Sequence, residues 1–146
     1  MSGKVIGVNT AIFSQSGGSV GIGFAISSNL ANSVVKQLVE FGRTRRGWLG
    51  VYIQDVTEEI ADSLDFNETR GALVSSVRPD SPAEAAKIKA GDIVLSFDGK
   101  RIEKMKELPR IVAETEVGSK VNVEVWREGK IQQLTVVLGE LEVAEN

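Results

Sequence analysis

The fold is decided by the stretch Arg45-Arg46-Gly47-Trp48-Leu49-Gly50-Val51-Tyr52-Ile53. It predicts a tight loop that runs directly into a β-strand, because Gly47 and Gly50 permit backbone conformations that other residues avoid. Successive N–H groups in such a loop can form a concave site for an anion. Leu49, Val51 and Ile53 follow a spacing of two, so their side chains share one face of the strand.

An anion site that opens onto an apolar strand face suits a peptide whose C-terminal carboxylate and last side chains bind together. We expect Arg45 or Arg46 to attract the carboxylate over a longer range. The alternative for these two arginines is that they are exposed linker charges. The alternative for the whole stretch is a glycine-bearing turn before an ordinary strand.

The composition excludes several classes of function. The chain has 146 residues, which is enough for about one domain. Its net charge of -3 and isoelectric point near 5.1 give no basic surface for nucleic acid. It contains no cysteine and no histidine, so it lacks thiolate metal ligands and the usual general base of a serine protease. We therefore expect no metal, no cofactor, no nucleic-acid partner and no catalytic residue in this chain.

The distribution of charge divides the chain near residue 42. Residues 1–42 carry three charged side chains, Lys4, Lys36 and Glu40, and residues 43–146 carry all the others. We expect a domain over residues 43–142 and a short tail over residues 143–146. No stretch approaches the ~20 apolar residues of a membrane helix, and the N-terminus lacks the pattern of a signal peptide.

The first block predicts two strands and a helix. Residues 5–13 predict a strand buried on both faces, and residues 20–26 predict a second strand. The helix that follows should be capped by Ser28 or Asn29 and ended by Gly42. Because two strands and one helix cannot bury so much apolar surface by themselves, we expect this block to be part of something larger.

The second block alternates short strands and helices. Thr57 and Ser81 are placed to cap two helices, the second with Pro82 in its first turn and Glu84 in a capping box. The pair Asp98-Gly99 predicts a tight turn. Expected strands are 51–54, 71–77, 121–126 and 131–138, residues 90–97 should form a turn that leads into a buried strand, and a third helix should follow Lys106. We predict a mostly β, α+β fold: a small, partly closed barrel of about five strands with two to three helices.

Several separated motifs resemble those of a PDZ domain of the bacterial HtrA (Deg) protease family. In the family's order and spacing they are Trp48-Leu49-Gly50-Val51, Asp80-Ser81-Pro82-Ala83, Ala90-Gly91-Asp92-Ile93-Val94 and Asp98-Gly99-Lys100. Residues 3–10 and 21–26 resemble the last strands of the family's chymotrypsin-like protease domain, and residues 29–41 resemble its closing helix and linker. The resemblance implies a remnant of that protease domain over residues 1–42, without its catalytic Ser, His and Asp, and the first PDZ domain over residues 43–142.

The resemblance also implies a binding site. The N–H groups of Leu49, Gly50 and Val51 would receive the terminal carboxylate, and the peptide would add a strand beside residues 51–54. Side chains of this strand and of the helix after Lys106 would form a pocket for an apolar last residue. The expected peptide-binding residues are Arg46, Trp48, Leu49, Gly50, Val51, Tyr52, Ile53, Leu108, Ile111 and Val112. For the last three, plain core packing is an equally open alternative.

By resemblance, the parent protein is a serine endopeptidase of protein quality control in the periplasm or cell envelope, and this chain is its regulatory part. Expected partners are the parent protease domain and the C-termini or hydrophobic segments of unfolded polypeptides, bound with micromolar affinity. One alternative is a domain for oligomer assembly, with its groove filled by a neighbouring element or with self-association through residues 4–26. Another is a Ser-Lys peptidase, for which no serine–lysine pair has a recognisable context.

Overall fold

The computed structural model describes residues 2–14, 17–18 and 21–141, so the expected tail at residues 143–146 lies outside the described residues. The chain divides into two compact units, residues 1–44 and residues 45–146. Each unit is described separately below.

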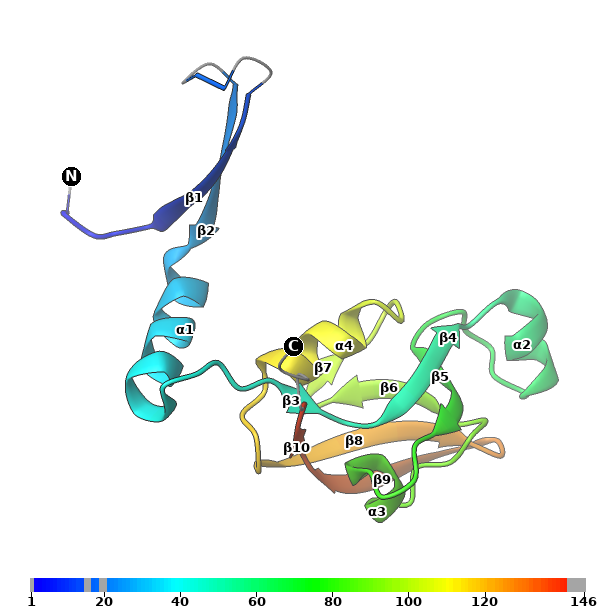
Figure 1. The fold of residues 1–146 in the computed structure, drawn as a ribbon. Coiled ribbons are helices and arrows are strands. Elements are labelled where there is room, and N and C mark those ends of the chain that lie inside the picture. Colours follow the sequence, from blue (N-terminus) through cyan, green and yellow to red (C-terminus); the bar gives the residue numbers. More distant parts are fainter. Residues whose placement is uncertain (1, 15–16, 19–20, 142–146) are drawn as a thin grey trace. The chain divides into compact units, whose positions relative to one another are not determined.

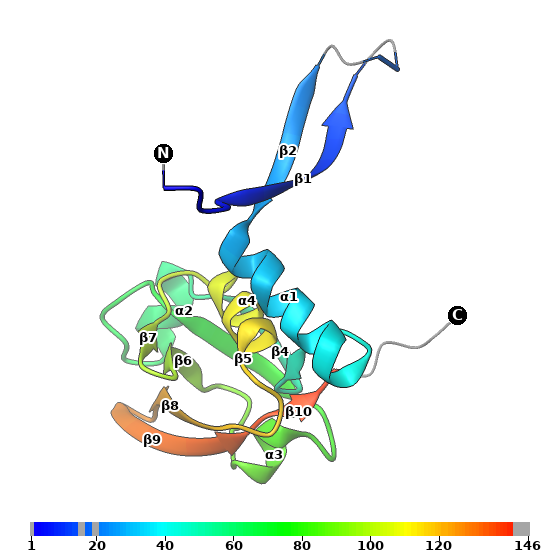
Figure 2. The same ribbon diagram turned by 90° about the vertical axis from the view of Figure 1, so that its left-hand side faces the viewer.

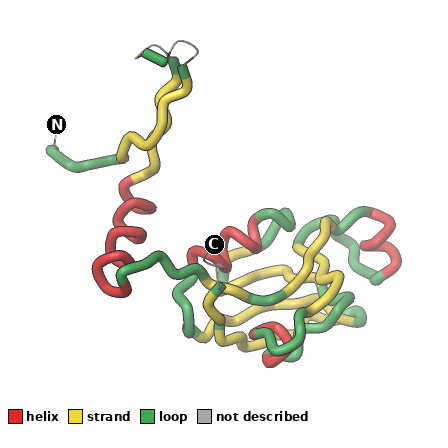
Figure 3. Tube along the Cα trace, viewed as in Figure 1, coloured by secondary structure: helices red, strands yellow, loops and turns green. Residues whose placement is uncertain are grey.

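The first unit is a hairpin followed by a helix. Strand β1 (Gly7–Phe13) pairs antiparallel with β2 (Ile22–Ser27), and α1 (Ser28–Phe41) follows directly (Figure 2, and in yellow and red in Figure 3). Gly42 ends the helix as expected, with a φ of 70° and its N–H bonded to the carbonyl oxygen of Leu38.

The expected side-chain cap of α1 is wrong. The residue at the N-cap is Ser27, not Ser28 or Asn29, and its side chain makes no capping hydrogen bond. The helix begins directly where β2 ends, because the extended backbone of Ser27 serves both elements. The N–H of Ser28 is bonded instead to the carbonyl oxygen of Ile6, just ahead of β1.

The expected burial of the first strand on both faces is also wrong for this chain. Val8, Ile12 and Phe13 are 47%, 56% and 65% exposed, and α1 has no buried residue among those described. The reason is that a two-stranded hairpin and one helix form a single layer, which leaves each apolar face without a second layer to cover it.

The second unit is built on one antiparallel sheet with the strand order β4-β5-β6-β8-β9 (Figure 1). A short strand, β7, pairs with β6, and two more, β3 and β10, pair with each other. The bounds are β3 (Gly47–Trp48), β4 (Val51–Asp55), β5 (Ala72–Val77), β6 (Ile93–Phe97), β7 (Lys100–Arg101), β8 (Lys120–Arg127), β9 (Lys130–Val137) and β10 (Gly139–Glu140). The five-stranded, mostly β architecture predicted from the sequence is confirmed.

Over residues 45–141, three helices accompany the sheet: α2 (Glu58–Ser63), α3 (Pro82–Ala85) and α4 (Glu107–Glu114). The first two begin at the predicted caps. The hydroxyl of Thr57 accepts a hydrogen bond from the N–H of Ile60 at 3.3 Å, and that of Ser81 accepts one from the N–H of Glu84 at 3.2 Å. The helix α4 ends at Glu114, four residues before the predicted breaker Gly118.

The core of the second unit forms where the sheet meets α3 and α4. It contains Ala83 from α3, Leu108 from α4 and the fully buried Phe97 of β6. A smaller apolar cluster with Phe66 lies beside α2, where Trp126 packs its ring against that of Phe66 at a centroid distance of 5.3 Å. Both clusters fix the sheet in place, so the strand that carries the predicted site has a rigid support.

A buried ion pair crosslinks the turn before β6 to the end of β8. The carboxylate of Asp92 is 1% exposed and receives two hydrogen bonds from Arg127, at 2.7 Å from Nε and 2.6 Å from Nη2. The N–H of Lys89 donates a third, at 2.8 Å. These bonds to Asp92 raise the pKa of Arg127 above its ordinary value.

A second carboxylate gives a pH-dependent prediction. Glu124 accepts hydrogen bonds from the hydroxyl of Ser96 at 2.7 Å and from Gln133 at 3.2 Å, and these bonds lower its pKa. A lowered pKa stabilises the fold above the unfolded-state pKa, and this contribution is lost as pH falls through the folded-state value. Ser96→Ala should therefore reduce the free energy of unfolding by about 1 kcal/mol or less at neutral pH, and by less in acid.

Denaturant unfolding of both proteins at about pH 7 and about pH 2 measures this difference. An equal loss at the two pH values would show that the Ser96 hydroxyl acts by packing and not through the charge of Glu124.

Candidate functional site

The candidate site is built on the segment between β3 and β4 (Figure 1). Within the described residues, its carbonyl groups accept hydrogen bonds from the domain while N–H groups stay without acceptors. The carbonyl oxygen of Leu49 accepts a hydrogen bond from the N–H of Ala83, and that of Gly50 accepts one from the N–H of Arg78, both at 2.9 Å. The N–H groups of Leu49 and Gly50 donate to no acceptor among the described residues. The loop is therefore anchored to the domain through its oxygens while two donors stay available.

The N–H of Val51 joins these two donors. Val51 lies opposite Val77 in the β4–β5 pair, and the bond from Arg78 to Gly50 makes this a non-hydrogen-bonded pair. The N–H and carbonyl of Val51 consequently face the other edge of β4, where no strand pairs within the described chain. We call the N–H groups of Leu49, Gly50 and Val51 the N–H cradle.

Both glycines of the loop are required by space. A Cβ at Gly50 would lie 2.3 Å from the Cβ of Ser81, and the φ of Gly50 is +83°. A Cβ at Gly47 would lie 2.2 Å from the carbonyl oxygen of Val112 in α4. The loop is thus pressed between α3 and α4, and only glycine permits this close approach.

The apolar residues predicted for the pocket fall into two groups, one buried and one half-buried. Leu49, Leu108 and Val112 are buried, which places them in the core beneath the site. Val51, Ile53 and Ile111 are half-buried and pack against the same core cluster. A half-buried residue keeps apolar surface available, so β4 and α4 each offer such surface beside the free edge of β4.

The other predicted site residues lie around the loop. Trp48 is half-buried, and Tyr52 is 57% exposed because its side chain points to the face of β4 opposite Val51 and Ile53. Arg46 is exposed, and its carbonyl accepts a hydrogen bond from the N–H of Leu141.

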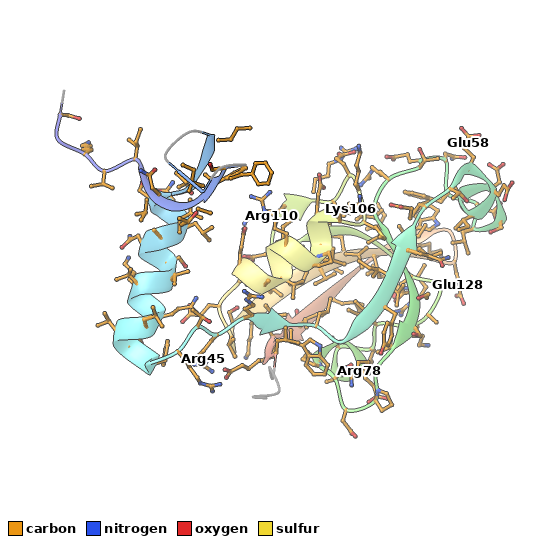
Figure 4. The ribbon with its side chains drawn as sticks, turned by 45° about the horizontal axis from the view of Figure 1, so that its top comes forward. Arg45, Glu58, Arg78, Lys106, Arg110 and Glu128 are labelled. Atoms are coloured by element: carbon orange, nitrogen blue, oxygen red, sulfur yellow. The ribbon has the colours of Figure 1, made fainter. Side chains whose placement is uncertain are left out.

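Two interactions near the loop were not evident from the sequence. The Nε of Arg45 lies 3.0 Å from a carboxylate oxygen of Glu140, a residue distant in the chain. The guanidinium of Arg78 lies over the ring of Trp48, 5.7 Å from its centroid. Figure 4 shows Arg78 beside the segment that joins β3 to β4. Only the pairing of β3 with β10 and of β4 with β5 brings these side chains to the loop.

A separate cleft of about 600 Å³ lies between the end of α2 and the β8–β9 turn. Its lining mixes Asp65, Lys89 and Glu128 with the ion pair of Asp92 and Arg127, whose polar atoms bind one another. We assign it no ligand. Within the described ranges, no cluster of three or more acidic side chains could hold a metal ion, and no helix is long and apolar enough to cross a membrane.

The sequence matches the PDZ domain family over residues 18–138, so the chain belongs to this family. The curated relatives of the chain show which PDZ-containing proteins it is similar to. A probable periplasmic serine endoprotease, DegP-like, from Marinomonas sp. is 48% identical over 138 residues, covering 94% of this chain and 29% of the relative. Its counterpart from Bartonella henselae is 47% identical over 146 residues, covering 100% of this chain and 29% of the relative.

Solved structures agree with these relatives. The HtrA-type protease AlgW with a decapeptide is 41% identical, with a TM-score of 0.73, over 94% of this chain and 42% of that chain. The serine endoprotease from Yersinia pestis is 31% identical, with a TM-score of 0.64, over 94% of this chain and 43% of that chain. The resemblance to the HtrA (Deg) family is confirmed. The chain spans less than a third of the length of the curated relatives described above.

Proposed function

We propose that residues 43–142 form the peptide-binding PDZ domain of a periplasmic DegP-like serine endoprotease. The domain binds the C-terminal or extended hydrophobic segments of unfolded polypeptides and serves protein quality control. Residues 1–42 are the C-terminal part of the parent's trypsin-like protease domain. The chain itself cleaves no peptide bond, since the catalytic residues belong to the rest of the parent.

The observation that carries this proposal is the N–H cradle next to a free strand edge. A carboxylate accepts several N–H bonds at once, and charge-assisted bonds of this kind are about twice as strong as neutral ones. The peptide then runs antiparallel to β4, because its C-terminus lies at the start of that strand. The cradle fixes the end of the peptide, and the edge of β4 binds its backbone.

The side chains of β4 and α4 give the peptide its specificity. Side chains of an added strand alternate, so the last residue and the third from last face the same way. Val51, Ile53 and Ile111 are half-buried members of the apolar cluster on this side. The last residue is therefore apolar. AlgW, which is 41% identical to this chain, is known in structures with a decapeptide and with a tripeptide.

A fluorescence titration tests the proposal. A peptide with an apolar last residue and a free carboxylate is added, and its C-terminally amidated twin is the control. Trp48 reports from the loop, and Trp126→Phe removes the background signal while keeping an aromatic ring against Phe66. The free acid should bind with micromolar affinity, and the amide at least about tenfold more weakly, because it lacks the charge.

Equal binding of both peptides would contradict the role of the cradle. Binding of neither peptide would favour a second candidate, a domain for oligomer assembly whose groove is occupied by a neighbouring element. That candidate has its own support in the exposed apolar side chains of the first unit, such as Ile6 at 87% and Val39 at 83%. Light scattering of the same samples separates a monomer from an assembly.

A further inference from the structure

Arg78 lies opposite Gly50, the central residue of the N–H cradle. It follows Val77, the partner of Val51, so it is opposite Gly50 in the antiparallel register. Its N–H donates the 2.9 Å hydrogen bond to the carbonyl oxygen of Gly50. Residues directly opposite on antiparallel strands have Cα atoms about 5 Å apart. The long side chain of Arg78 therefore starts beside the central residue of the cradle.

The guanidinium of Arg78 is held near this position. It lies 5.7 Å from the ring centroid of Trp48, within the range of a cation–π contact. The same ring lies against the loop, because a Cβ on Gly50 would be 3.1 Å from Cζ2 of Trp48. No acidic side chain of the described residues forms an ion pair with Arg78.

The other arginines near the loop are placed differently. Arg45 is tied to Glu140 by the 3.0 Å ion pair, so its charge is compensated. Arg46 is exposed, and its side chain has no described interaction that orients it. Of the arginines next to the loop, Arg78 alone combines an oriented guanidinium with an absence of acidic partners within the described residues.

We propose that Arg78 is the specificity-determining cation of this site, which makes it select peptides with a free C-terminal carboxylate. This inference rests on the proposed function. Arg78 acts through its charge, with Trp48 orienting the guanidinium toward the loop. A guanidinium and a carboxylate that lie several ångströms apart still attract each other in water, and the attraction strengthens where protein excludes solvent. The N–H cradle supplies short-range bonds, and Arg78 adds the preference for a charged end over a neutral one.

The test compares three variants: Arg78→Gln, Arg78→Lys and the control Lys130→Gln, which removes an exposed positive charge on β9, at the edge of the sheet opposite β4. Dissociation constants are measured for the free-acid peptide and its amide at low and high salt. Arg78→Gln should weaken binding of the free acid about three- to tenfold and leave the amide unchanged. It should also reduce the salt dependence of free-acid binding.

Arg78→Lys keeps the charge and should retain most of the preference for the acid. Lys130→Gln should change free-acid binding less than about twofold, because an exposed charge far from the loop is screened by solvent. If Arg78→Gln weakens the acid and the amide equally, its role is structural and the inference is wrong. Unchanged free-acid binding by Arg78→Gln would overturn it as well. A wild-type protein that does not distinguish acid from amide would instead refute the proposed function and this inference with it.

Discussion

Replacing Gly50 by alanine should abolish carboxylate recognition and destabilise the domain by about 2–4 kcal/mol. The added Cβ would lie 2.3 Å from the Cβ of Ser81, and the φ of +83° is unfavourable for any residue with a side chain. The loop must move to relieve this overlap. Because the carbonyl of Gly50 is bonded to the N–H of Arg78, such movement reorients the N–H groups of the cradle.

Gly118→Ala is the matched control. Gly118 has nearly the same φ, +84°, but a Cβ there would meet nothing within 4 Å. The Gly118→Ala variant should therefore lose only about 1–2 kcal/mol of its free energy of unfolding, which is the cost of holding alanine in the left-handed conformation. It should bind the free-acid peptide as the wild type does. Denaturant unfolding and peptide titration of both variants make the comparison. Similar losses of stability and affinity in the two variants would show that crowding against Ser81 has no role.

Replacing Asp92 by alanine should lower the free energy of unfolding by about 3–5 kcal/mol. Removal of the carboxylate leaves Arg127, which is 16% exposed, without the partner of two short hydrogen bonds. It also leaves the N–H of Lys89 without its acceptor. The pair lies away from the loop, so peptide affinity should be unchanged wherever the variant remains folded.

Glu114→Ala is the control for a surface ion pair. Glu114 lies 3.1 Å from Arg110 within α4, and the two side chains are 46% and 79% exposed. Its removal should cost about 0.5 kcal/mol or less, because exposed pairs are screened by solvent. Urea unfolding of both variants tests the contrast. A loss in Asp92→Ala as small as that in Glu114→Ala would mean that burial adds little to the Asp92–Arg127 pair.

The elements of the second unit could be predicted because their signals are local. Thr57 and Ser81 cap helices through N–H groups three residues ahead, and Asp98-Gly99 turns between neighbouring strands. The loop at Gly47 and Gly50 followed from residue type alone. For the two caps and the turn, the residues that decide the conformation are close together in the sequence, so spacing was sufficient to predict them.

Apart from the local error at the cap of α1, the structure departs from the sequence analysis in the burial of β1 and in contacts between residues far apart in the chain. The apolar strand β1 was expected to be buried, yet burial requires a second layer that the described part of residues 1–44 does not provide. The ion pair of Arg45 with Glu140 depends on the pairing of β3 with β10. Arg78 reaches the loop through the register of β4 and β5. No spacing rule reveals such contacts, because they exist only after the sheet forms.

The bulge in β5 bears on the site as well. The register of β4 and β5 shifts between Tyr52 and Ile53, and the hydroxyl of Ser75 bonds to the carbonyl oxygen of Tyr52 at 3.2 Å. The extra residue lies on β5, so the alternation along β4 is unbroken. Val51 and Ile53 consequently keep their side chains on one face, as an added peptide strand requires.

The most direct test of the cradle is the amide proton spectrum of the protein by two-dimensional NMR. The free-acid peptide and its amidated twin are titrated in turn, and the resonances of Leu49, Gly50 and Val51 are followed. Gly129, in the β8–β9 turn, serves as an internal reference. The free-acid peptide should shift the amide protons of these three residues downfield, as hydrogen bonds to a carboxylate do, and should change that of Gly129 little. The amidated peptide should leave all four resonances nearly unchanged. Three unmoved resonances, or equal shifts with both peptides, would contradict carboxylate binding by this loop.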